Sequence, residues 1–292
     1  MGEHHPECPD RLRAIHDRLV AARLVDFLWE LEAPEVTREQ LRRVHAAAYL
    51  DSLEQLAPIS GIRHLDPDTV MNPHTLAAAR RAAGAAALAV DLVVGGQART
   101  AFCSVRPPGH HAESNRAMGF CFYNNLAVGV AHALAQHGLK RVAVVDFDVH
   151  HGNGTEEIFR DDPRVTMVSV FQHPFYPYMG IEGRSERMVN IPLRAYSGGA
   201  ELRAAVERHW LPALEAFRPE LIFVSSGFDA HRADDMASLN FTEADYAWVT
   251  ERIREVADRH AGGHMISLLE GGYELDATAR SVEAHLRALM GL

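Results

Sequence analysis

The sequence predicts an α/β fold in which helices cover both faces of a mainly parallel sheet. Two observations carry this prediction: short apolar runs alternate with longer helical patterns, and polar clusters follow most of these runs. No Ser/Gly/Pro-rich linker, charge block or fixed-period repeat divides the 292 residues. We therefore expect one domain that covers residues 1–292.

The predicted strands are short β-branched or apolar runs bounded by turn residues. They are Thr100–Val105, Arg141–Asp148, Val165–Phe171, Leu221–Ser226 and Met265–Leu269. Amphipathic or alanine-rich segments predict the helices, several of which begin at a capping residue. These segments are Pro9–Trp29, Arg38–Ala57, Pro73–Val94, Asn124–His137, Gly199–Phe217, Thr242–His260 and Asp276–Leu289.

Composition narrows the classes of function. A hydrophobic content of 47% supports a sizeable core, and the net charge of −10 argues against a nucleic-acid surface, which needs clustered cations. The N-terminus lacks a basic and then apolar stretch, and no run of about 18 apolar residues follows. We expect a cytoplasmic protein that binds neither nucleic acid nor membrane, with its three cysteines reduced.

The most informative stretch is Val144–Thr155, where an apolar run ends in carboxylates, imidazoles and glycines. Side chains on a strand alternate between faces, so Asp146, Asp148 and His150 should share one side. These groups can all bind metals. The alternative is a polar strand end that only caps the next helix, with Asn153 or Thr155 as the cap. A cap does not need two carboxylates and two histidines, so we favour a site.

Three further polar clusters stand at strand ends. Arg106–Ala112 follows the first strand, Ser225–His231 overlaps and follows the fourth, and Glu270–Tyr273 follows the fifth. Because ligands of α/β sheets bind beyond the carboxyl ends of the strands, one cleft can gather all of these clusters.

These motifs carry a resemblance to a known family. RPPGHHA, GFCFYNN, DFDVHHGNGT, SSGFDAHRADD and EGGYEL occur in the order found in histone deacetylases and acetylpolyamine amidohydrolases, and the chain is most similar to bacterial, class II-like members. The resemblance implies a three-layer αβα fold of the arginase type. It also implies one catalytic Zn²⁺, with Fe²⁺ as a substitute. Family members usually begin with a strand before the segment at His5, and we expect that strand to be absent here.

By this resemblance the metal ligands are Asp148, His150 and Asp229. Two carboxylates and one imidazole leave an open position, as a catalytic metal requires. From the residues alone, Asp229 could equally cap a helix. The resemblance also implies a structural K⁺ near Asp146, Asp148 and His150.

His110 and His111 are expected to be the paired imidazoles beside the metal-bound water. One ring accepts the proton of the water, and a protonated ring later donates to the leaving amine. The resemblance implies that Asp146 orients His110 and that Asn153 faces His111, in place of the aspartate that is common at this position.

Tyr273 is expected to donate its hydroxyl to the oxyanion, while Gly271 and Gly272 let the loop bring its ring close. The alternative for Tyr273 is a buried core tyrosine beside a glycine turn.

The remaining expected contacts form a tunnel for the substrate. Phe120, which follows Gly119, and Tyr176 resemble the two aromatic residues that flank the methylene stem of an acyl-lysine. Met236 stands where polyamine-selective relatives place a glutamate. The loop from Ser60 to Asn72 is too weakly patterned to assign, although Asp66 or Asp68 could contact the rim.

The hypothesis is a metal-dependent amidohydrolase that removes acetyl or short acyl groups from lysine side chains, with acetylated polyamines as the second substrate class. Two further alternatives remain open at this point. A binuclear manganese hydrolase of the arginase type needs more carboxylates than follow His150. A module that binds acyl groups without catalysis would not need Tyr273 and both histidines.

Overall fold

The computed structural model describes residues 2, 5–181 and 185–292, and its centre is a parallel sheet. The six strands lie in the order β3-β8-β7-β4-β5-β6, and every pair of neighbours runs parallel. Their bounds are β3 Thr100–Cys103, β8 Met265–Leu269, β7 Leu221–Ser226, β4 Val142–Asp146, β5 Val165–Gln172 and β6 Met188–Leu193. All carboxyl ends therefore meet at one edge, as predicted.

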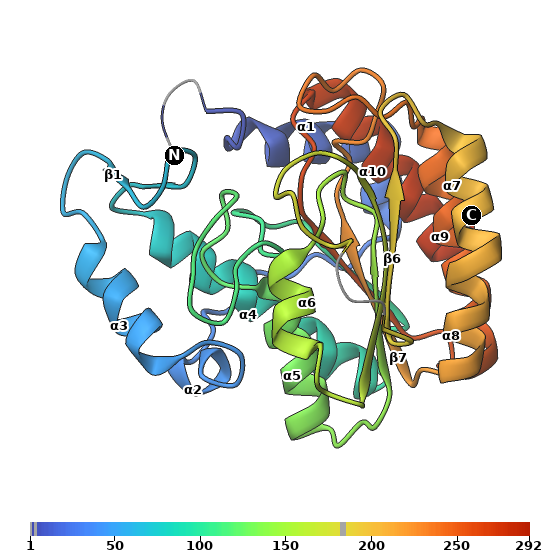
Figure 1. Ribbon diagram of the computed structural model, residues 1–292, viewed down its shortest axis with the longest axis horizontal. Coiled ribbons are helices and arrows are strands. Elements are labelled where there is room, and N and C mark those ends of the chain that lie inside the picture. The colour runs from blue at the N-terminus through green and yellow to red at the C-terminus, as the bar shows by residue number, and fades with distance from the viewer. Residues whose placement is uncertain (1, 3–4, 182–184) are drawn as a thin grey trace.

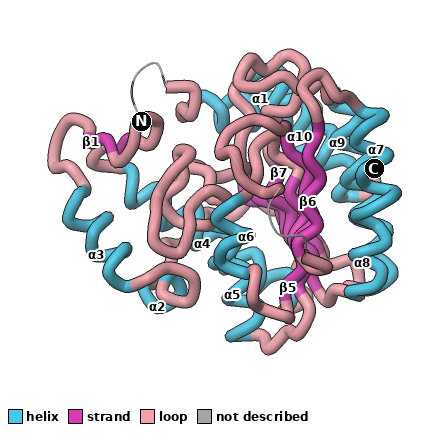
Figure 2. The backbone as a smooth tube through the Cα atoms, viewed as in Figure 1, coloured by secondary structure: helices cyan, strands magenta, loops and turns pink. Residues whose placement is uncertain are grey.

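Helices cover both faces of this sheet, which confirms the predicted three-layer α/β architecture (Figures 1 and 2). One layer holds α4, α5 and α6, and the other holds α1, α7, α8, α9 and α10. Helix bounds are α1 Asp10–Ala21, α2 Arg38–Leu41, α3 Ala47–Leu56, α4 Thr75–Val94, α5 Asn125–Gln136, α6 Asn153–Phe159, α7 Gly199–Ala205, α8 Leu211–Phe217, α9 Glu243–His260 and α10 Leu275–Met290.

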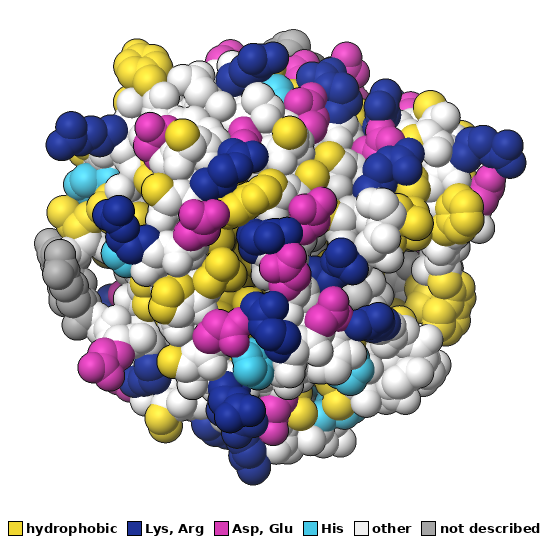
Figure 3. Space-filling model, turned by 90° about the vertical axis from the view of Figure 1, so that its right-hand side faces the viewer, with side chains coloured by type: hydrophobic (Ala, Val, Ile, Leu, Met, Phe, Trp, Pro, Cys, Tyr) yellow, Lys and Arg dark blue, Asp and Glu magenta, His cyan; other side chains and the backbone are white. Residues whose placement is uncertain are grey.

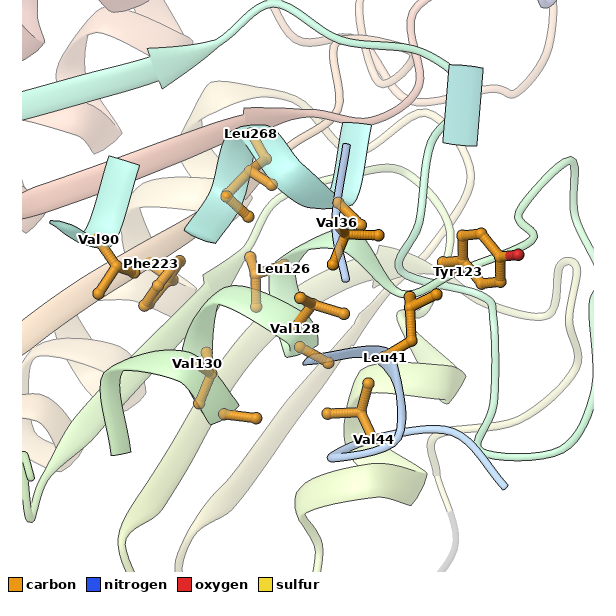
Figure 4. Close-up of a cluster of buried hydrophobic side chains, with 14 of the residues drawn as sticks. Val36, Leu41, Val44, Val90, Tyr123, Leu126, Val128, Val130, Phe223 and Leu268 are labelled. Atoms are coloured by element: carbon orange, nitrogen blue, oxygen red, sulfur yellow. The ribbon is translucent and has the colours of Figure 1, made fainter. Parts of the chain in front are cut away.

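Alternate side chains of the strands pack into two cores, one between the sheet and each helix layer. In β4, Val144 packs into the core beneath α4 and α5, whereas Val145 packs into the core beneath α9 and α10. Figure 4 shows the first of these cores, in which Phe223 of β7 and Leu268 of β8 lie among side chains of α4 and α5. Both faces of the sheet are buried, which explains the nearly continuous apolar runs of its strands.

Several predicted boundaries were wrong for local reasons. Arg38–Ala57 is two helices, because the chain leaves α2 and the amide of Ala46 donates to the carbonyl of Ser114 before α3 begins. Pro9–Trp29 is helical only to Ala21; a 3₁₀ turn, Leu24–Phe27, follows a left-handed Arg23 (φ 56°).

The strand that was predicted to reach Asp148 ends at Asp146, so Asp148 and His150 lie on the loop that follows it. The side chain of Asn153 does not cap α6; Gly152 occupies the cap position. Neither β6 nor the short antiparallel pair β1 (Arg63–His64) and β2 (Val70–Met71) was predicted from the sequence.

At one edge of the sheet, β3 has a single neighbour, β8, among the strands that the structure describes. A groove of about 620 Å³ runs along its outer side. Phe27 and Trp29 contribute to the wall of this groove and are 71% and 63% exposed. The expectation of an absent first strand stays a prediction.

Surface charges are mixed on the face that Figure 3 draws, where Arg side chains lie interspersed with Asp and Glu. None of the described helices combines the length and the apolar character that crossing a membrane would require.

Two buried histidines make the stability of the fold dependent on pH. His45 accepts from the amide of Asn124 (3.0 Å) and lies 3.0 Å from the carbonyl of Glu113, and burial lowers its pKa to about 4. Burial likewise lowers the pKa of His285 to about 3. Below about pH 6.5 these histidines bind protons in the unfolded chain, whereas in the folded protein their rings stay neutral until the pH is much lower.

We therefore expect the free energy of unfolding to fall as the pH drops from about 6.5 towards 4, by up to about 1.4 kcal/mol per pH unit for each histidine. Urea denaturation at pH 7 and pH 5 measures this loss. His45→Gln should make the difference between the two pH values smaller, and an unchanged difference would contradict the assignment.

Candidate active site

Three side chains that could together hold a metal ion converge beyond the carboxyl ends of β4 and β7. Nδ1 of His150 lies 3.0 Å from Oδ1 of Asp148 and 3.3 Å from Oδ2 of Asp229. The other carboxylate oxygens are held by main-chain amides: Gly271 donates to Oδ2 of Asp148 (2.8 Å) and Val149 donates to Oδ1 of Asp229 (3.0 Å). Both carboxylates are therefore oriented with one oxygen towards the imidazole.

This donor set fits a divalent cation. Asp148 and Asp229 are each 1% exposed, and Oδ2 of Asp229 has no hydrogen-bond partner among the described residues. Two buried carboxylates repel each other unless a positive charge lies between them. Glycine at positions 227 and 271 provides the room, because a Cβ atom at either one would overlap a carboxylate oxygen of the pair. The open set of two carboxylates and one imidazole suits Zn²⁺ or Fe²⁺.

Next to this group lie two histidines with different partners. Nδ1 of His110 lies 3.0 Å from Oδ2 of Asp146, and Nδ1 of His111 lies 2.8 Å from Oδ1 of Asn153. The amide nitrogen of Asn153 donates to the carboxylate of Glu113 (2.8 Å), which leaves the amide oxygen facing His111. His111 therefore donates through Nδ1, and its Nε2 is the nitrogen that can accept a proton.

The same surroundings separate the pKa values of the two rings. Burial disfavours the cation of His110, but the charges of Asp148 and Asp146 outweigh it and raise its pKa. Burial lowers the pKa of His111 well below its usual value, and the neighbouring charges of His110 and His150 lower it further. These opposite shifts favour a protonated His110 beside a neutral His111.

Tyr273 follows β8 on a loop that is held by its main chain. Its amide and that of Glu274 both donate to Oδ2 of Asp234, at 2.6 and 3.0 Å. The guanidinium of Arg11 lies 5.0 Å from the centre of the tyrosine ring. Burial, followed by the charge of Asp229, raises the pKa of Tyr273 well above its usual value, so its hydroxyl keeps its hydrogen and can donate it.

A cavity of about 270 Å³ leads to these groups. Its wall consists of Asp68, Pro108, His110, His111, Gly119, Phe120, His150, Phe175, Tyr176, Met236, Gly271 and Tyr273. The Phe120 ring meets that of Tyr273 edge-on at 5.9 Å, and the Tyr176 ring meets that of His111 at 5.3 Å. Gly119 has a φ of +56°, and a Cβ atom there would overlap the His111 ring. Aromatic rings thus line the approach to the histidines.

The structure brings most of the predicted site residues to this cavity. Asp146, Asp148, Asn153 and Asp229 lie behind its wall and contact the residues that form it. Gly272 does not line the cavity; its φ of +122° lets the chain pass close to Phe228 and Thr278.

The structure also places here Phe175 and Glu270, to which the sequence assigned no role, and Asp68, which was named only, with Asp66, as a residue that could contact the rim. Asp68 and Phe175 line the cavity, and the ring of Phe175 stacks on that of His150 at 5.4 Å. Asp68 lies in the loop that was left unassigned. Glu270 was visible as the first letter of the EGGYEL motif, but its contacts are with residues far away in the chain.

A second group of possible metal ligands lies elsewhere, on α4 and at the end of α5. Nε2 of His132 and Nε2 of His137 lie 2.8 and 2.7 Å from Oδ1 of Asp91. Nδ1 of His132 faces the guanidinium of Arg43 at 3.2 Å and therefore accepts a hydrogen bond. Its Nε2 then carries the hydrogen and donates it to Asp91, so in this arrangement neither nitrogen of His132 is free to bind a metal.

Comparisons with known proteins agree with this geometry. A family model for the histone deacetylase domain matches residues 5–289. A histone deacetylase-like amidohydrolase of Pseudomonas aeruginosa is 41% identical over 92% of this chain and 72% of its own. A human protein named polyamine deacetylase HDAC10 is 36% identical over 98% of this chain and 45% of its own.

A solved structure, described as the HD domain of HDA15, superposes with a TM-score of 0.94. It is 36% identical to this protein, and the match covers 100% of this chain and 83% of the solved one. The shared domain, the sequence identity and the common fold together show that the chain belongs to the histone deacetylase family.

Proposed function

We propose that this protein is a zinc-dependent deacetylase, with Fe²⁺ as a substitute metal, that hydrolyses the amide of acetyl-lysine or of another short acyl-lysine. The observation that carries the proposal is the meeting of three groups at one cavity: the metal donors, the oriented His110–His111 pair and the Tyr273 ring. Asp148, His150 and Asp229 would hold the metal. When bound, it would polarise the substrate carbonyl and lower the pKa of the attacking water.

The proton steps follow from the two imidazoles. Nε2 of the neutral His111 takes a proton from the attacking water as the oxygen forms its bond to the carbonyl carbon. The hydroxyl of Tyr273 donates to the oxygen that becomes negative. The C–N bond then breaks, and the nitrogen takes a proton from an imidazolium of the pair. The products are a carboxylate and a free amine.

The walls of the cavity favour a lysine side chain over a polyamine. Phe120 and Tyr176 offer aromatic surfaces that can bury a methylene stem without demanding hydrogen bonds. Asp68 contributes a carboxylate that can accept from the main-chain amides of a peptide. Met236 contributes no charge to attract a second ammonium group.

Acetylated polyamines are the second candidate, because one relative is named a polyamine deacetylase and because Asp68 is acidic. We also propose K⁺ near Asp146, Asp148 and His150, as the family resemblance implies.

The first prediction concerns substrate choice. We expect an acetyl-lysine peptide to have a higher kcat/KM than N-acetylputrescine, and Met236→Glu to shift this ratio towards the polyamine, because a carboxylate there would attract its free ammonium group. Steady-state assays of product amine measure both values. A wild-type preference for N-acetylputrescine would support the alternative, and inactivity on both substrates would contradict both.

The second prediction concerns the metal. We expect one bound metal per chain by elemental analysis, and Asp229→Asn should weaken its affinity at least about 100-fold in chelator competition, because a charged ligand is lost. Asp235→Asn, an exposed residue of the same loop, is the matched control and should bind normally. Two tightly bound metals per chain would instead favour the binuclear hydrolase.

The third prediction concerns the reacting side chains. Tyr273→Phe removes the oxyanion donor and His111→Ala removes the proton acceptor, and each should lower kcat at least about 100-fold. Single-turnover assays with the metal content checked for each variant separate this effect from metal loss. A rate close to that of the wild type in either variant would remove the role assigned to that residue.

A further inference from the structure

Glu270 is a buried carboxylate at the end of β8 to which the mechanism above assigns no task. Its residue is 0% exposed. Oε2 accepts from two consecutive main-chain amides, those of Gly109 at 2.7 Å and His110 at 3.1 Å. Oε1 accepts from the hydroxyl of Ser225 at 3.1 Å. All three of these partners are donors, and two of them belong to the loop that carries the histidine pair.

Glu270 directly precedes other residues of the site in the chain. Gly271, the next residue, donates its amide to Asp148, and Tyr273 lies two residues further on. One four-residue segment therefore touches the loop of His110 through the Glu270 side chain, holds a metal donor through a main-chain amide, and carries the tyrosine.

We propose that Glu270 is a positioning residue that fixes the His110–His111 loop relative to Tyr273 and Asp148. This inference rests on the function proposed above and adds a residue to it. Glu270 does not line the cavity, so it acts through the main chain of the loop and not on the substrate.

The physical reason lies in the irregular main chain of the histidine loop. The amides of Gly109 and His110 do not belong to a helix or a strand, and a buried amide without an acceptor is unfavourable. A Cβ atom at Gly109 would overlap the amide of Asn125, so this part of the loop is packed closely on its other side as well. With the carboxylate in place, both amides have an acceptor in the observed arrangement of the loop. Errors of about 1 Å in the placement of catalytic groups can cost about 100-fold in rate.

Two conservative changes separate positioning from charge. Glu270→Gln keeps the length of the side chain and an oxygen for both amides but removes the charge. Glu270→Asp keeps the charge but shortens the side chain by one methylene, so the carboxylate no longer reaches the amides. We expect Gln to retain kcat within about fivefold and Asp to lower kcat at least about 30-fold, with KM changed less than about threefold in both.

The reverse order, with Asp retaining kcat and Gln losing it, would overturn the inference and assign the effect to charge. Equal losses in both variants, or wild-type kcat in both, would overturn it as well. Asp245→Asn is the matched control: Asp245 is a buried carboxylate that accepts from the amide of Thr242 (2.9 Å) at the start of α9. It should lower the melting temperature and leave kcat unchanged.

Amide hydrogen exchange provides a measurement that does not depend on activity. In Glu270→Asp we expect the amides of Gly109 and His110 to exchange at least about tenfold faster than in the wild type, and in Glu270→Gln we expect them to stay protected. If the wild type hydrolyses no acyl-amine, the proposed function fails, but this exchange pattern still tests the loop contact. Unchanged exchange in Glu270→Asp would overturn the inference itself.

Discussion

The site depends on keeping two carboxylates, Asp148 and Asp229, side by side in the interior. Oxygen atoms of the two carboxylates lie within 4.8 Å of each other, and two negative charges so close are unfavourable in a medium of low polarity. Neither carboxylate is paired with Lys or Arg among the described residues. Main-chain amides take one oxygen of each, and His150 lies between the other two. The parallel sheet makes this arrangement possible, because the carboxyl ends of its neighbouring strands β4 and β7 lie at the same edge.

The surroundings of the pair follow from that constraint. Glycines at 227 and 271 let the chain pass where any side chain would overlap the carboxylates. The loop after β8 can therefore pass close to the two carboxylates. Tyr273, two residues after Gly271, lines the same cavity. Asp234 secures the loop by accepting from its amides on the far side. Rigidity at the site thus comes largely from hydrogen bonds to the main chain.

The sequence predicted the sheet and most of the cavity well, for a common reason. Strands buried on both faces appear as apolar runs, and the site residues stand directly after those runs, so their place at the sheet edge could be inferred. β6 was not predicted because Asn190 and Pro192 interrupt its apolar pattern, which is tolerated in an edge strand. Glu270 was missed for a different reason: its side chain contacts Gly109 and His110, which lie 161 and 160 residues away in the chain, and no local pattern records such contacts. Asp68 was named as a residue that could contact the rim, but its loop carries no pattern that assigns it a place in the cavity.

Asn153 has a wider consequence for the two neighbouring imidazole rings. His110 and His111 are chemically identical, and one difference between their surroundings is that a carboxylate stands behind His110 and an amide behind His111. A carboxylate favours a ring that stays charged, whereas an oriented amide fixes the tautomer without adding charge. A one-atom difference in the supporting side chain, an amide nitrogen in place of an oxygen, thus gives two chemically identical neighbouring rings different electrostatic surroundings.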